Sequence, residues 1–114
     1  MNDVEFVEGL KIAVLNAEDY ISGIRKPAGR APDKKLLELS VWYNELPHDD
    51  QRMVDSIIAE SLEFGVWGFL CVLDGVRKFT NRNGRLKLIF EDLDLGESYE
   101  ISNSDAFGHM HDLI

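Results

Sequence analysis

Cysteine is almost absent from this chain of 114 residues. Cys71 is the only one, so an intrachain disulfide is excluded. It lies in the apolar run 69–73 without a charged neighbour, which predicts a buried, unreactive thiol. A chain of this length can bury enough surface to fold without a disulfide or a metal. We therefore predict a single domain over residues 1–114 that needs no cofactor.

Sequence signatures of catalysis and of membrane insertion are also missing. The chain has no nucleophile motif of the G-x-S-x-G type, no glycine loop for phosphate and no internal repeat. Its acidic N-terminus does not match a signal peptide, and the apolar stretch 64–76 contains Asp74 and is too short to span a bilayer. We expect a cytoplasmic protein without a membrane partner, and a binding protein rather than an enzyme.

Positive charge is scarce, with 12 Lys and Arg against 21 Asp and Glu, giving a net charge of -9. Such a surface repels phosphate backbones, so we expect no nucleic-acid partner. It favours rapid association with a basic protein. Most of the basic residues fall within 25–35 and 77–87, and none follows Lys87. We interpret these stretches as solvated faces and loops.

Apolar residues at spacings of three and four predict helices in the first half of the chain. The first helix is expected over residues 4–24 with Asp3 as its cap, followed by a loop over 25–32. A second helix is expected to open at Pro32 or Asp33 and to end at Pro47. A third is expected to start at His48, with an acidic first turn.

Residues 64–73 are apolar on every side, which predicts a segment buried all round. Periodicity does not separate a central helix from a buried strand here. We favour a helix that continues from the third one, kinked near Gly65 and ended by Asp74 and Gly75.

The last third of the chain alternates with the period of a strand. Asn83-Gly84 predicts a hairpin between a strand over 76–80 and a second over 86–90, and residues 98–101 suit a third strand after a turn. Asn103 or Ser104 is expected to cap a short closing helix. Its inward residues would be Phe107, Met110 and Leu113 or Ile114. The predicted fold is α+β: three to four N-terminal helices packed on a small antiparallel sheet of two to three strands, with a short C-terminal helix.

His109, His111 and Asp112 form the best candidate metal site. An H-x-H pair shares one face on a strand but not on a helix, and zinc needs three or four ligands. We therefore favour exposed histidines. A metal-binding protein or small metal-dependent hydrolase is kept as the alternative. The acidic segment 91–97 lacks the ligand spacing of a calcium loop and is interpreted as an acidic turn.

Trp42 is the aromatic residue best placed to anchor a partner if it is exposed. Packing of its indole in the core is the interpretation we favour. In size, acidity and absence of catalytic motifs, the chain resembles the small immunity proteins with which bacteria neutralise toxins. That resemblance implies a non-enzymatic inhibitor of a basic protein. The expected contact residues are Trp42 and six acids: Asp49, Asp50, Glu91, Asp92, Asp94 and Glu97. A homo-oligomeric structural module, such as a homodimer, is the remaining alternative.

Overall fold

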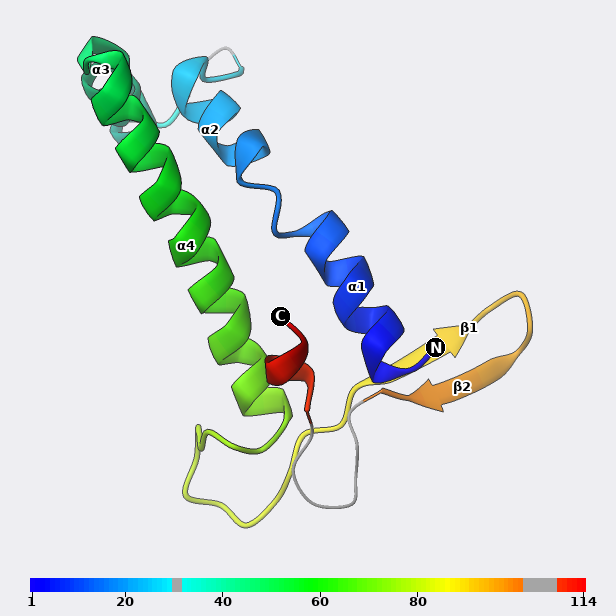
Figure 1. Ribbon diagram of the computed structural model, residues 1–114. Helices are drawn as coiled ribbons and strands as arrows, with labels where there is room; N and C mark the ends of the chain where they lie inside the picture. Colours follow the sequence, from blue (N-terminus) through cyan, green and yellow to red (C-terminus); the bar gives the residue numbers. More distant parts are fainter. Residues whose placement is uncertain (30–31, 102–108) are drawn as a thin grey trace. The chain divides into compact units, whose positions relative to one another are not determined.

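The computed structural model describes residues 1–29, 32–101 and 109–114 (Figure 1). Helices come first along the chain and a small sheet follows, so the α+β prediction is confirmed. In chain order the elements are α1 (Asp3–Ala13), α2 (Ala17–Arg25), α3 (Lys34–Glu45), α4 (His48–Leu73), β1 (Ile89–Asp92), β2 (Glu97–Glu100) and the 3-10 helix η1 (Met110–Leu113).

The chain packs as two compact units. The terminal unit contains residues 1–13 and 63–114, and the inserted unit contains residues 14–62. Helix α4 runs through the boundary, so its first part belongs to the inserted unit and its last part to the terminal unit. The single-domain assignment stays a prediction.

The prediction of one helix over residues 4–24 is wrong, because the chain breaks into α1 and α2. Asn16 is the cause: its backbone is extended, with φ -88° and ψ 94°, and its side chain accepts a hydrogen bond from the Glu18 N–H. This is N-cap geometry, which starts a new helix. The predicted cap at Asp3 is wrong by one position: Asp3 is the first residue of α1, and Asn2 Oδ1 accepts the Glu5 N–H at 2.9 Å.

Helices α3 and α4 follow the predicted pattern. Asp33 is the N-cap residue of α3, and Leu46 ends that helix directly before Pro47. Helix α4 begins at His48 with Asp49 and Asp50 in its first turn, where carboxylates suit the positive end of a helix dipole.

The helical interpretation of residues 64–73 is confirmed, and the strand alternative is wrong. Gly75, with φ +81°, closes α4: its N–H donates to the carbonyl of Val72, and the Val76 N–H donates to that of Cys71. This pair of bonds is a Schellman motif. By length and composition alone α4 could cross a membrane, and 17% of its most apolar window is buried.

The prediction that this segment is buried on every side is wrong. Phe64 and Phe69 are 66% and 60% exposed, whereas Leu70 and Cys71 are buried. The core of the terminal unit is small, formed by Val7, Leu70, Ile101 and Met110, and it packs against the side of α4 that carries Leu70. The inserted unit has its own core of Ile21, Ile24 and Tyr43.

The sheet is one antiparallel hairpin, in which Ile89 pairs with Glu100 and Asp92 pairs with Glu97. The strand predicted over 76–80 and the hairpin predicted at Asn83-Gly84 are wrong, since residues 76–88 contain no strand. The turn lies instead between β1 and β2. There Asp92 Oδ1 accepts the N–H groups of Asp94 and Leu95, and Gly96 adopts φ +66°. This side-chain bonding closes a turn without an Asn-Gly pair.

The described part of the C-terminus forms the short 3-10 helix η1. Met110 is buried in the terminal core as predicted, and Leu113 and Ile114 are half-buried against it. The predicted caps Asn103 and Ser104 and the predicted inward residue Phe107 lie outside the described residues.

Candidate functional site

Trp42 lies on the outside of α3, and the prediction that its indole packs in the core is wrong. The side chain is 54% exposed, while the adjacent Tyr43 is 1% exposed. Neighbouring residues on a helix point about 100° apart, so a buried Tyr43 turns Trp42 away from the centre of the core. The exposed indole meets the condition under which the sequence predicts a partner anchor.

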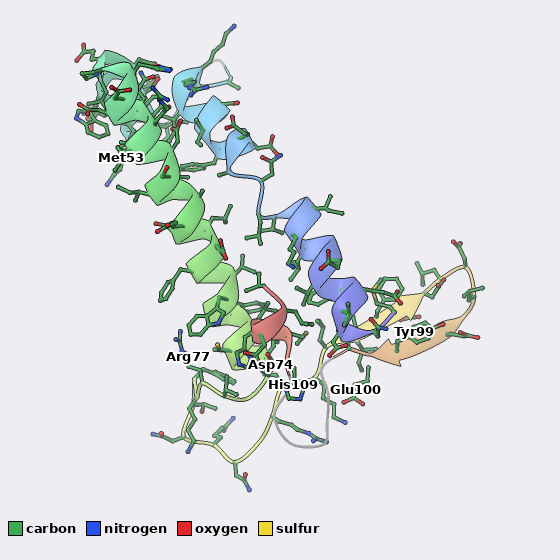
Figure 2. The ribbon with its side chains drawn as sticks, in the orientation of Figure 1. Met53, Asp74, Arg77, Tyr99, Glu100 and His109 are labelled. Carbon is green, nitrogen blue, oxygen red and sulfur yellow. The ribbon has the colours of Figure 1, made fainter. Side chains whose placement is uncertain are left out.

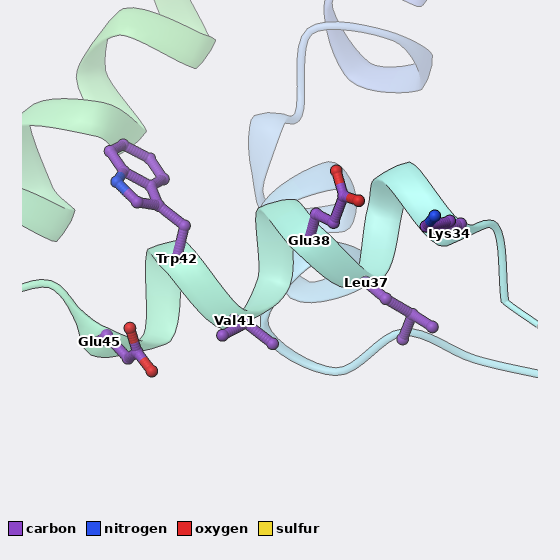
Figure 3. A pocket seen from close by; sticks show the side chains of 6 residues that line it. All are labelled: Lys34, Leu37, Glu38, Val41, Trp42 and Glu45. Atoms are coloured by element: carbon purple, nitrogen blue, oxygen red, sulfur yellow. The ribbon is translucent and has the colours of Figure 1, made fainter.

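Trp42 lines a shallow apolar groove along α3, with a volume of about 440 Å³. We call this surface the α3 groove. Figure 3 shows Leu37 and Val41 projecting to one side of the helix and Trp42 projecting to the other side in this view. Both aliphatic side chains are exposed. Three charged residues complete the lining: Lys34, Glu38 and Glu45.

A second recess within the inserted unit adjoins this groove, because Trp42 lines both. Its volume is about 210 Å³, and it lies among helices α2, α3 and α4. Its other lining residues are mostly apolar: Tyr20, Ile24, Leu39, Tyr43, Val54 and Ile58. The indole therefore stands between two apolar depressions of one unit.

A partly buried polar network joins the three helices that carry this surface. The Tyr43 hydroxyl donates to Asp55 Oδ1 at 2.7 Å, and Arg25 Nη2 donates to the same hydroxyl at 3.2 Å. Burial and the bond to Asp55 raise the pKa of Tyr43, and the bond to Tyr43 raises the pKa of Arg25. Asn44 Nδ2 donates to the Arg25 carbonyl and Gln51 Nε2 to the Tyr43 carbonyl. The network joins α2, α3 and α4.

Sequence reasoning missed this network. Tyr43 and Asp55 are twelve residues apart, and Arg25 is eighteen residues from Tyr43, so no local spacing signals the contact. Arg25 also begins the stretch predicted as a loop, whereas it is the last residue of α2. One general feature of the sequence could have indicated the network: a tyrosine on the inner side of a helix needs a hydrogen-bond partner for its hydroxyl.

The six predicted contact acids fall into two sets, one in each unit. Asp49 and Asp50 are exposed in the first turn of α4, within the inserted unit. Asp49 forms an ion pair with Arg52 at 2.7 Å. The hairpin of the terminal unit carries the rest: Glu91, Asp92, Asp94 and Glu97.

Two of the hairpin acids serve the hairpin itself. Asp92 accepts the two turn N–H groups, and Glu97 accepts a hydrogen bond from the Tyr99 hydroxyl. That bond is the main cause of the raised pKa of Tyr99. Glu91 and Asp94 are exposed beside Leu93, one of the most exposed leucines of the chain. These two acids are therefore the better candidates for a charge contact.

The histidine site predicted at the C-terminus has a different geometry from a metal centre. His109 is exposed, whereas the ring of His111 lies with Nδ1 2.7 Å from Asp74 Oδ2 and Nε2 3.3 Å from Asp112 Oδ1. Asp74 Oδ2 also accepts the His111 N–H at 2.8 Å. Among the described residues, no group of three or more His, Cys, Asp or Glu side chains is arranged to hold a metal.

Asp74 and Cys71 lie at the buried end of α4. The Asp74 carboxylate ties η1 to this end of the helix, a contact that sequence reasoning missed because Asp74 was interpreted only as a helix stop. The predicted burial of Cys71 is confirmed, and burial raises the pKa of its thiol. A protonated, covered thiol is a poor nucleophile.

Comparison with known proteins finds no relative. No family model, no curated protein and no solved structure matches the chain. A functional assignment therefore rests on the surfaces described above and on the charge of the chain.

Proposed function

We propose that this protein binds a basic protein partner through the α3 groove and neutralises it without catalysing a reaction. The observation that carries the proposal is the exposed indole of Trp42 between two apolar depressions. Tryptophan is among the residues that contribute most often to hot spots of protein interfaces. A cytoplasmic location, in keeping with the resemblance to immunity proteins, is part of the same proposal.

The form of the groove supports a protein ligand. Leu37 and Val41 extend the apolar surface beside the indole, and Glu38 and Glu45 supply acidic groups at its margin. Interfaces commonly combine an apolar centre with a polar rim. The network of Tyr43, Asp55 and Arg25 fixes the helices behind the groove, so little ordering is needed on binding.

The net charge of -9 supports a basic partner. Opposite charges accelerate the encounter of two proteins and weaken wrong pairings. Asp49 and Asp50 lie in the same unit as the groove, and Glu91 and Asp94 add negative charge on the hairpin. We infer that these acids guide the encounter while Trp42 holds the bound state.

The test compares wild type with Trp42→Ala, and uses Phe79→Ala as a matched loss of an exposed aromatic ring from the other unit. The partner is captured with the tagged protein from its own cells, identified by mass, purified and titrated. We expect Trp42→Ala to weaken its binding by about 30-fold or more, as loss of a hot-spot residue does. Inhibition of the partner's activity should fall in parallel, and Phe79→Ala should bind as wild type.

Two results would overturn the proposal. One is an equal affinity of wild type and Trp42→Ala for the purified partner. The other is a solution mass showing a homodimer that Trp42→Ala converts to a monomer, which would assign the groove to self-association. Metal analysis of the same wild-type sample tests the metal-dependent alternative.

A further inference from the structure

The loop 76–88, between α4 and β1, concentrates positive charge in an otherwise acidic protein. It contains no acidic residue and five of the twelve Lys and Arg residues of the chain. We call it the basic loop. Every residue from 76 to 87 is exposed. Its basic residues are Arg77, Lys78, Arg82, Arg85 and Lys87.

Apolar side chains are interspersed among these charges. Phe79 is 64% exposed, and Val76 and Leu86 are exposed as well. Exposed apolar groups weaken the interpretation of the loop as a plain solvated surface, because the exposure of apolar surface to water is unfavourable. An anionic bilayer surface satisfies both kinds of side chain: its headgroups attract Lys and Arg, and its interfacial region takes up rings and aliphatic groups.

Both ends of the basic loop are fixed to the terminal unit. At its start, the Schellman motif closes α4, and the Arg77 guanidinium lies 5.3 Å from the centre of the Trp67 ring. Figure 2 shows Arg77 near the end of α4. At its end, Lys87 Nζ lies 3.8 Å from Glu100, and the Leu88 carbonyl accepts the Ile101 N–H. The middle of the loop, with Lys78, Phe79 and Arg82, is thus presented on a fixed base.

We propose that the basic loop binds the surface of a membrane rich in anionic phospholipids. The chemistry recognised is the negatively charged headgroup layer of a bilayer together with its apolar margin. We expected no membrane partner from the acidic N-terminus and the short apolar stretch 64–76, but contact with a membrane surface depends on neither feature. The proposal is independent of the α3 groove, which lies in the other unit.

Nucleic acid is the competing polyanion, and the loop suits it less well. Single-stranded nucleic acid is usually held on successive aromatic rings, whereas Phe79 is the only aromatic residue of the loop. A long polyanion would also meet the acidic remainder of the protein. A bilayer can be touched by one loop alone.

The test is co-sedimentation of the full chain with vesicles of phosphatidylcholine, with and without about 30 mol% phosphatidylserine, at about 0.05 and 0.5 M salt. We expect binding to the anionic vesicles at low salt and loss of that binding at high salt. Lys78→Gln with Arg82→Gln should lower the partition coefficient about 25-fold, since each basic residue near such a surface contributes about fivefold. Phe79→Ala should lower it about tenfold.

Matched controls remove the same groups elsewhere. Lys34→Gln with Lys35→Gln changes the net charge equally in the inserted unit, and Leu93→Ala removes an exposed apolar group from the hairpin. Both should partition as wild type, as should Trp42→Ala. Circular dichroism confirms that each variant is folded.

The proposal is overturned if the wild type does not bind the anionic vesicles at low salt, binds neutral vesicles equally well, or loses as much binding with the control substitutions. Binding of a single-stranded RNA of about 20 nucleotides, weakened by Lys78→Gln with Arg82→Gln in the absence of vesicle binding, would assign the loop to nucleic acid instead.

Discussion

At the scale of single residues, Tyr43 shows how a buried hydroxyl depends on its partners. The ring is part of the core of the inserted unit, and the hydroxyl contacts both Asp55 and Arg25. Loss of the hydroxyl would leave the Asp55–Arg25 pair in place, at 3.4 Å, without its third member. The same three side chains join α3, which carries Trp42, to α2 and α4. Loss of one of their contacts would therefore affect the α3 groove.

We predict that Tyr43→Phe lowers the free energy of unfolding by about 1–2 kcal/mol at neutral pH, because a partly buried hydrogen bond to a charged group is lost. Urea unfolding measures it. Tyr20→Phe, at an exposed tyrosine, is the matched control and should change stability by less than about 0.5 kcal/mol. Equal effects of the two substitutions would contradict the role given to the hydroxyl.

The stability provided by Tyr43 should also depend on pH. The raised pKa means that the folded protein keeps the phenolic proton after the unfolded chain has lost it, near pH 10. The folded state then binds more protons, so the contribution is complete below about pH 10 and is lost as the pH rises through the folded pKa. The stability difference between wild type and Tyr43→Phe should therefore narrow at alkaline pH.

Residue properties that depend on neighbours in sequence were predictable, and those that depend on distant packing were not. The burial of Cys71 follows from the apolar residues beside it. The exposure of Trp42 depends on how α3 is rotated against α2 and α4, which Tyr43 and its distant partners determine. The Asp74–His111 contact joins residues 37 positions apart, and no periodicity of the sequence predicts it.

At the scale of elements, the glycine at the end of α4 sets where the helix stops. Gly75 has φ +81°, a conformation that costs a residue with a Cβ about 1 kcal/mol. We predict that Gly75→Ala lowers the free energy of unfolding by about that amount, measured by thermal or urea denaturation. No neighbouring atom lies within 4 Å of a Cβ added there, so the cost is conformational and not a clash.

Gly84→Ala is the matched control. A Cβ at Gly84 also meets no atom within 4 Å, and Gly84 is not among the glycines with positive φ. Its substitution should change stability by less than about 0.5 kcal/mol. A loss at Gly84 as large as that at Gly75 would show that the conformational argument is wrong.

The contrast between local signals and distant contacts also explains which elements the sequence could predict. Helix α4 was predictable across its length, because apolar spacing and a glycine stop agree. The hairpin was displaced, because Asn83-Gly84 favours a turn locally while Asp92 closes one further along by bonding to two N–H groups. The break between α1 and α2 was hidden, because apolar spacing continues across Asn16 and only its capping role interrupts the helix.

At the scale of the whole molecule, negative charge is the property most open to test. We predict that Glu91→Lys with Asp94→Lys slows association with the basic partner by about tenfold and flattens its dependence on salt, with little change in dissociation. Stopped-flow or surface-based kinetics measures both rates. These two acids are chosen because Asp92 and Glu97 also hold the hairpin, and their reversal would disturb it.

Glu60→Lys with Glu63→Lys gives the same change in net charge at exposed positions of α4 that lie outside the six expected contact acids. An effect equal to that of the hairpin variant would mean that total charge, rather than its place on the hairpin, guides the encounter. No effect of either variant would contradict electrostatic guidance altogether. Thermal unfolding of all variants separates these outcomes from loss of structure.

The insertion of one unit within the other has a consequence for how the protein is made. The core of the inserted unit lies within one continuous segment, residues 14–62, and is formed by Ile21, Ile24 and Tyr43. This core can therefore assemble while translation continues. Val7 leaves the ribosome before these residues but packs against Leu70, Ile101 and Met110, which are made later. The apolar face of α1 therefore stays uncovered until Leu70, Ile101 and Met110 have been synthesised.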